Sequence, residues 1–99
     1  ELKEVKIMLE KKLQIKNESG LHARPASIFV NKAGEFDSEI KIVFNGNEIN
    51  AKSIMGLMGL GIESGKEITL KINGKDENKA MDELSYLINE KLAEVDDDE

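Results

Sequence analysis

The sequence has 99 residues, 39% of them hydrophobic, with one histidine and no cysteine. This length allows one small domain and excludes a multidomain enzyme. The lack of cysteine excludes disulfides, thiol catalysis and cysteine-based metal sites. We expect neither a metal nor a cofactor. The net charge is −6, from 14 basic and 20 acidic residues, which argues against nonspecific nucleic-acid binding.

The first third of the chain predicts a strand and a helix. Residues 11–16 alternate between apolar and polar side chains, which indicates a half-buried strand, and the turn-forming residues 17–20 (NESG) end it. A helix is expected from about His22 to Gly34, with Pro25 in its first turn, where an N–H group has no intrahelical partner. Its apolar face consists of Ala26, Phe29, Val30 and Ala33.

The middle of the chain predicts a β-hairpin and a short helix. Residues 39–44 alternate, and the pair Asn45-Gly46 is typical of a tight turn into a partner strand over 47–51. Ser53 is a favoured N-cap residue, so a short helix is expected after it.

A fourth strand over residues 68–72 and a long helix capped by Asp76 complete the pattern. The apolar stripe of that helix consists of Ala80, Met81, Leu84, Leu87, Ile88, Leu92 and Val95. Because each strand alternates, one face of the sheet is covered and the other is wet. The fold class is therefore α+β, a two-layer open-faced sandwich with a four-stranded antiparallel sheet and the order β-α-β-β-α-β-α.

The only histidine, His22, lies within residues 20–26 (GLHARPA), where the first strand gives way to the first helix. The N–H groups and dipole of a helix start bind anions, and they disfavour an imidazolium, which biases His22 toward its neutral, nucleophilic form. Arg24 could clamp phosphate oxygens. Together these residues suggest a phosphohistidine site. The alternative is that His22 is a solvated surface residue, which is the commoner fate of a lone histidine beside an arginine.

Ser53 and the apolar residues after it form a second candidate site. A phosphate on Ser53 would suit a helix start, although the serine already has a role as a cap. Met55 and Met58 could form a docking patch, because methionine adapts to irregular partner surfaces. Leu57 and Leu60 are expected in the core.

Residues 20–26 (GLHARPA) and 52–58 (KSIMGLM), at this separation, resemble the family of HPr, the histidine-containing phosphocarrier of the phosphoenolpyruvate-dependent sugar phosphotransferase system. The likeness covers roughly residues 9–92. It implies a sheet order of 1-4-2-3 with three helices on one face. It also implies that His22 accepts phosphate on Nδ1 from enzyme I and passes it to enzyme II A domains, with Arg24 steadying the phosphoryl oxygens. Such a protein is a covalent carrier rather than an enzyme.

The sequence of residues 52–58 resembles the Gram-positive branch of that family more than the enteric branch. This branch implies that Ser53 is a regulatory site of HPr kinase/phosphorylase. The serine-phosphorylated form is then the corepressor of a catabolite-control transcription factor, partly through Ile54, Met55 and Met58.

Two alternatives belong to other functional classes. A purely regulatory relative would signal through Ser53 alone, but such relatives typically lack the histidine. An RNA-recognition module would need aromatic residues on the open sheet face and a basic surface.

Both ends of the chain extend past the resemblance. We expect one domain over residues 1–99, with an N-terminal extension over 1–7 and a frayed acidic tail over 96–99. No apolar run reaches the roughly 18 residues of a membrane span and no signal peptide is found, so a cytoplasmic protein without membrane insertion is expected. We also expect a monomer.

Overall fold

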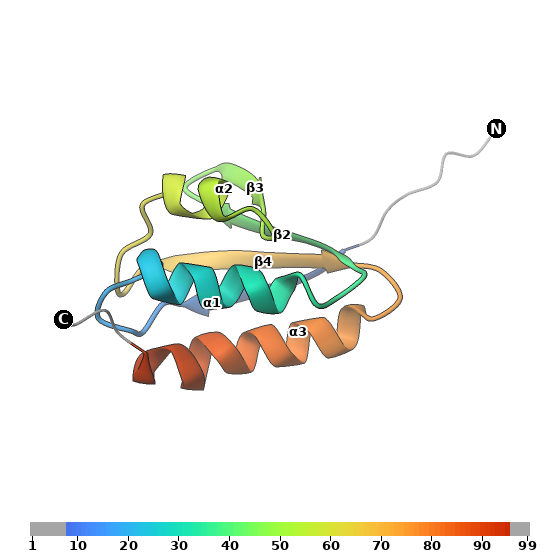
Figure 1. Ribbon diagram of the computed structural model, residues 1–99. Coiled ribbons are helices and arrows are strands. Elements are labelled where there is room, and N and C mark those ends of the chain that lie inside the picture. The colour runs from blue at the N-terminus through green and yellow to red at the C-terminus, as the bar shows by residue number, and fades with distance from the viewer. Residues whose placement is uncertain (1–7, 96–99) are drawn as a thin grey trace.

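The computed structural model describes residues 8–95, so the expectations for an extension over 1–7 and a tail over 96–99 lie outside the described residues (Figure 1). The elements follow the predicted order of strands and helices. Their bounds are β1 Leu9–Gln14, α1 Ala23–Ala33, β2 Glu39–Phe44, β3 Asn47–Asn50, α2 Ile54–Gly59, β4 Glu67–Asn73 and α3 Glu77–Tyr86. None of the helices in this part of the chain is long and apolar enough to cross a membrane.

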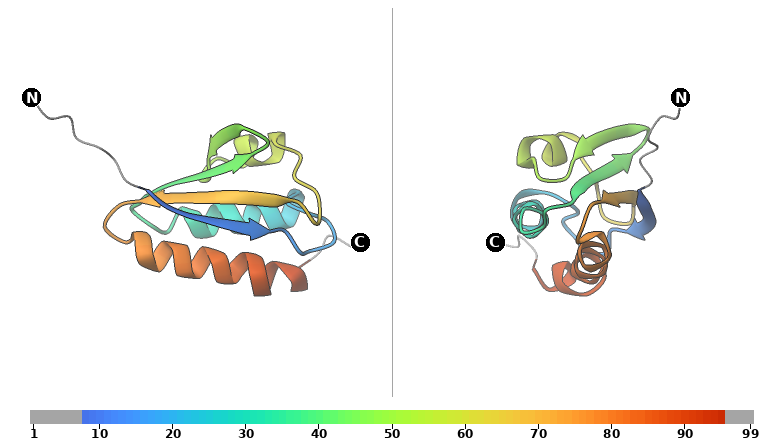
Figure 2. Two further views of the ribbon diagram at one scale, coloured as in Figure 1. Left: turned by 180° about the vertical axis from the view of Figure 1, so that it is seen from behind. Right: turned by 90° about the vertical axis from the view of Figure 1, so that its right-hand side faces the viewer.

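The four strands form one antiparallel sheet in the order β1-β4-β2-β3, which confirms the expected fold class and strand order. The β2–β3 hairpin turns at Asn45 and Gly46, whose φ angles of 51° and 82° are those of a primed turn. Figure 2 shows the helices on one side of the sheet, with α1 and α3 lying along it and α2 beside α1. The other face is left open.

The core fills the space between the sheet and the helices. Ile42 and Leu70 are paired on β2 and β4, and both are fully buried. Phe29 of α1 and Leu84 of α3 belong to the same core cluster and have no exposed surface. The apolar positions of the alternating and helical patterns therefore form one hydrophobic core, as predicted.

The open face of the sheet carries a network of ion pairs. Lys41 and Lys71 lie directly opposite each other on β2 and β4. Glu48 of β3, the strand on the other side of β2, contacts both, with its carboxylate 3.0 Å from the Lys41 Nζ and 3.5 Å from the Lys71 Nζ. The hydrogen bond from Lys41 lowers the pKa of Glu48. Phe44, the only aromatic residue of the four strands, is buried. This face therefore lacks the aromatic platform of an RNA-recognition module.

The last helix departs from the prediction at both ends. Asp76 occupies the N-cap position of α3, but its side chain makes no capping hydrogen bond, so the expected cap is wrong. At the other end the chain leaves α-helical geometry after Tyr86, passing through a π-helical turn (Leu87–Lys91) and a 3-10 turn (Leu92–Glu94). Val95, the last residue of the predicted stripe, is only half-buried.

The Asp76 carboxylate binds a different element instead. It accepts hydrogen bonds from the backbone N–H groups of Asp37 at 2.9 Å and Ser38 at 3.0 Å, and another from the Ser38 hydroxyl. These bonds, that of the Ser38 hydroxyl foremost, lower the pKa of Asp76. A Cβ at Gly74 would lie 2.6 Å from the Ser38 Cα, so the two loops meet too closely for any other residue.

Candidate functional site

The segment between β1 and α1 is held by contacts with residues far along the chain. Leu21 is fully buried, and its N–H donates to the Ile62 carbonyl at 2.9 Å. Gly20 has a φ of 69°, and a Cβ there would lie 2.5 Å from the Ile62 oxygen. Only glycine fits this close approach, which delivers the chain to the start of α1.

His22 is the N-cap residue of α1, as its place in the sequence predicts. Its backbone is extended, with φ −119° and ψ 157°, and its side chain is half-buried and makes no capping hydrogen bond. The first turn contains no acidic residue, and Pro25 contributes no N–H group to it. The positive end of the helix dipole is therefore not neutralised by a local carboxylate, and it lies beside the imidazole.

The residue after the histidine has a strained backbone. Ala23 has a φ of 44°, in the left-handed region that a residue with a Cβ avoids. Such a conformation costs about 1–3 kcal/mol and persists only when the surroundings enforce it. Arg24 follows in the first turn, and its side chain is exposed. The structure thus brings the histidine and the arginine to the same helix start.

Ser53 is the N-cap residue of α2, and its Oγ accepts a hydrogen bond from the Gly56 N–H at 3.0 Å. The predicted cap is therefore confirmed. Its side chain is half-buried. A Cβ at Gly56 would approach the Ser53 Oγ to 3.3 Å, so glycine gives the serine room at this position.

The apolar residues after Ser53 divide between the core and the surface. Leu57 is fully buried, whereas Met55 is 82% exposed, Met58 41% and Ile54 36%. Leu60, expected in the core, is half-buried and packs against it. The three exposed side chains therefore form an accessible apolar surface on α2, which packs beside α1.

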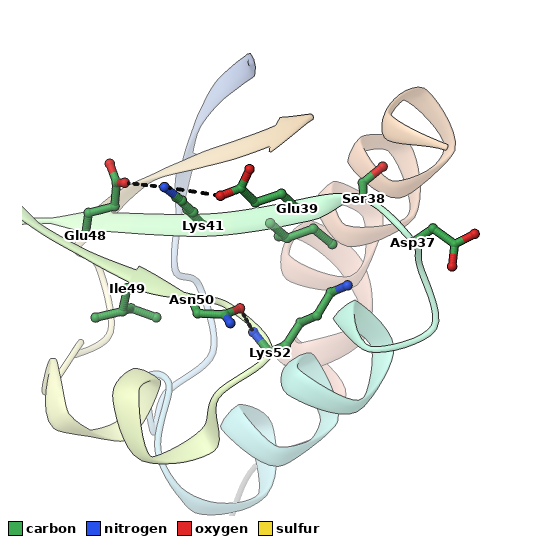
Figure 3. A pocket seen from close by; sticks show the side chains of 9 residues that line it. Asp37, Ser38, Glu39, Lys41, Glu48, Ile49, Asn50 and Lys52 are labelled. Atoms are coloured by element: carbon green, nitrogen blue, oxygen red, sulfur yellow. Dashed lines mark hydrogen bonds and ion pairs between the residues drawn. The ribbon is translucent and has the colours of Figure 1, made fainter. Parts of the chain in front are cut away.

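Two hollows of the described surface are lined by residues other than His22, Arg24, Ser53 and the exposed side chains of α2. One of 340 Å³ opens beside β2 and β3 (Figure 3). Its cations are already engaged: the Lys41 Nζ lies 3.0 Å from the Glu48 carboxylate, and the Lys52 Nζ donates to the Phe36 carbonyl at 2.7 Å. Another, of 400 Å³, is lined by Lys32, Asp82, Glu83, Tyr86, Leu87 and Lys91.

The arrangement of the two helix starts can be compared with known proteins. Residues 9–90 match the family described as the PTS HPr component phosphorylation site. The chain belongs to the HPr family. Its relatives include both carriers and HPr-like proteins. It is 52% identical to the HPr-like protein Crh of Halalkalibacterium halodurans, over 82% of this chain and 96% of that protein. It is 43% identical to the phosphocarrier protein HPr of Buchnera aphidicola, over 84% of this chain and 98% of that one.

Solved structures of the HPr family share the fold. HPr-C-His from Thermoanaerobacter tengcongensis superposes with a TM-score of 0.82 and 45% identity, covering 85% of this chain and 94% of that one. Crh of Bacillus subtilis superposes with a TM-score of 0.67 and 41% identity, over 84% and 95% of the two chains, and it is described as a dimer with a swapped domain. The expectation of a monomer is therefore not confirmed.

Proposed function

We propose that this member of the HPr family is a phosphocarrier of the sugar phosphotransferase system that works in the cytoplasm. In this proposal His22 accepts a phosphoryl group from phosphorylated enzyme I and passes it to enzyme II A domains. The observation that carries the proposal is the position of His22, an accessible imidazole at an uncapped helix start without acidic neighbours in the first turn. Membership in a family defined by its phosphorylation site supports it.

The transfer exchanges one phosphorus–nitrogen bond for another. The lone pair on Nδ1 of His22 attacks the phosphorus of the phosphohistidine on enzyme I. The bond between phosphorus and the donor nitrogen breaks, and the donor histidine recovers its electron pair. The N–H groups at the start of α1 and the Arg24 guanidinium offset the charge of the phosphoryl oxygens. No metal or cofactor of the carrier enters the step.

We further propose that Ser53 is a regulatory phosphorylation site of HPr kinase/phosphorylase. The phosphorylated chain would then bind a catabolite-control transcription factor partly through Ile54, Met55 and Met58, whose exposure makes that surface available. A purely regulatory role, without transfer at His22, is the second candidate, because an HPr-like protein named Crh is 52% identical to this chain.

Incubation with phosphoenolpyruvate and enzyme I, followed by phosphorus NMR, separates the two candidates. A carrier gives an acid-labile phosphoramidate signal that is absent from His22→Ala. Addition of an enzyme II A domain should then discharge the signal. If the folded wild-type chain gives no such signal while HPr kinase/phosphorylase still modifies Ser53, the carrier function is wrong and the regulatory one stands.

A further inference from the structure

The segment that presents His22 contains a buried polar side chain. Asn17 is 2% exposed, and its amide nitrogen donates to the Gly20 carbonyl at 2.7 Å and to the Ser19 hydroxyl at 3.3 Å. An amide group has two N–H donors, so both are engaged within three residues of the chain. In the sequence Asn17 is only one of four turn-forming residues. Its burial and its two hydrogen bonds indicate that it also restrains the backbone before His22.

The Gly20–Leu21 peptide unit is held at both ends, and the Asn17 amide holds one of them. The carbonyl of that unit belongs to Gly20 and accepts from Asn17, while its N–H belongs to Leu21 and donates to the Ile62 carbonyl at 2.9 Å. The Gly20 N–H closes the turn by donating to the Asn17 carbonyl at 3.1 Å. The direction of the chain one residue before His22 is therefore set by these bonds.

This part of the chain needs such a restraint. Gly20 lacks a Cβ, and its backbone can rotate at little steric cost. Ala23, on the far side of His22, holds a left-handed φ of 44° that relaxes unless its surroundings prevent it. His22 thus lies between a permissive residue and a strained one, and a rotation of the Gly20–Leu21 peptide would move the imidazole relative to the start of α1.

We propose that Asn17 is a positioning residue for phosphoryl transfer at His22. Its buried amide keeps the Gly20–Leu21 peptide in one orientation, so that the imidazole is held beside the N–H groups of α1 when the phosphoryl group arrives. This inference rests on the proposed carrier function and adds to it a residue that does not touch the phosphoryl group.

The test compares Asn17→Asp and Asn17→Ala with the wild-type chain. The aspartate has nearly the same shape, but its carboxylate cannot donate to the Gly20 carbonyl at neutral pH. Lys16→Gln makes the same change in charge at a neighbouring exposed position. Met81→Ala removes core contacts in α3, a helix that contributes no residue to the bonds around Gly20 and Leu21, and so controls for lost stability alone.

Two readouts are needed. In single-turnover transfer from phosphorylated enzyme I, both Asn17 variants should lower the maximal rate by about tenfold or more, with little change in the half-saturating concentration, because misplaced reacting groups slow the step itself. Hydrogen exchange of the Leu21 amide should be faster in both variants than in Met81→Ala of equal global stability. Lys16→Gln and Met81→Ala should transfer at close to the wild-type rate.

The outcomes separate this inference from the function on which it rests. If the wild-type chain is phosphorylated and the Asn17 variants transfer as fast as the two controls, Asn17 is only a structural residue. The same conclusion follows if Leu21 exchange in the Asn17 variants equals that in Met81→Ala. If the wild-type chain is not phosphorylated at all, the carrier function fails first and this inference fails with it.

Discussion

Ala23 separates the histidine from the arginine, and it has one of two positive φ angles recorded for non-glycine residues among residues 8–95. Its strain is local and lies directly at the helix start that the proposed chemistry uses. Strained residues persist at functional sites because the surrounding structure compensates for them. Here that structure is the buried Leu21, the Gly20 contact with Ile62 and the Asn17 amide.

The Arg24 guanidinium should raise the rate of phosphoryl transfer to His22. If it binds phosphoryl oxygens through two parallel N–H groups, lysine cannot replace it fully, because an ammonium has no planar fork. Arg24→Lys should therefore slow phosphorylation by enzyme I several-fold, and Arg24→Glu should slow it by about a hundredfold. Circular dichroism should show both variants folded. Equal rates in all three chains would make Arg24 ordinary surface charge.

Among the described residues, Ser85 carries the one buried side-chain polar atom that lacks a hydrogen-bond partner. It is 5% exposed, and its hydroxyl has no partner. Because a buried unpaired hydroxyl is destabilising and alanine favours helices, Ser85→Ala should raise the free energy of unfolding by about 1 kcal/mol. Urea denaturation measures this change. A lower midpoint would mean that the hydroxyl is paired in solution, and the phosphorylation rate should not change in either case.

At the scale of elements, α2 is a short helix held by its cap and by one buried leucine. The Ser53 Oγ accepts from the Gly56 N–H, and Leu57 is the buried residue of the helix. Its remaining large side chains, Ile54, Met55 and Met58, face solvent. A helix this short is marginal on its own, so its cap contributes much of its local stability. The same serine is the proposed regulatory site.

Ser53 substitutions should separate capping from docking. Ser53→Ala removes the cap and should lower the free energy of unfolding by about 1 kcal/mol. Ser53→Asp keeps an acceptor at a helix start that tolerates negative charge, so its melting temperature should change little. It should nevertheless slow phosphorylation of His22 by an acidic enzyme I surface, and more so at low salt, where repulsion is least screened. Identical rates at low salt would leave Ser53 as a helix cap alone.

At the scale of the whole molecule, the Asp76 carboxylate ties the start of α3 to the start of β2. Ser38 is 1% exposed, and its hydroxyl and N–H both donate to this carboxylate. The link joins segments that are distant in the sequence. It lies away from His22, at the end of the sheet where β2 begins and α3 starts (Figure 1).

This link predicts a specific sensitivity to acid. The folded state lowers the pKa of Asp76 below its ordinary 3.8, so its stabilising effect is present above that pH and is lost as the pH falls below it. Asp76→Asn should lower the melting temperature at pH 7 and flatten the dependence of stability on pH in the acidic range. Thermal melts at several pH values measure both effects. Parallel curves for the two chains would show that the carboxylate does not contribute.

Local patterns in the sequence predict most of the fold. Alternation in β2 and β4 and helical spacing in α1 identify these elements, because each periodicity follows from backbone geometry and places apolar residues on one face. The start of α1 at His22 and the Ser53 cap of α2 also follow from neighbouring residues alone. The sequence by itself therefore determined the elements and the fold class. It also determined that His22 and Ser53, on which the proposed function depends, lie at helix starts.

Only the tertiary structure decided which distant groups meet. Asp76 has a typical capping pattern, yet the β2 loop supplies three donors to its carboxylate and the cap is not made. Asn17 belongs to an ordinary turn, yet it is 2% exposed and its amide binds Gly20, which lies against Ile62. Such contacts depend on the register and packing of segments far apart in the chain, and no local periodicity encodes them. The restraint on His22 could be found only once those segments were placed side by side.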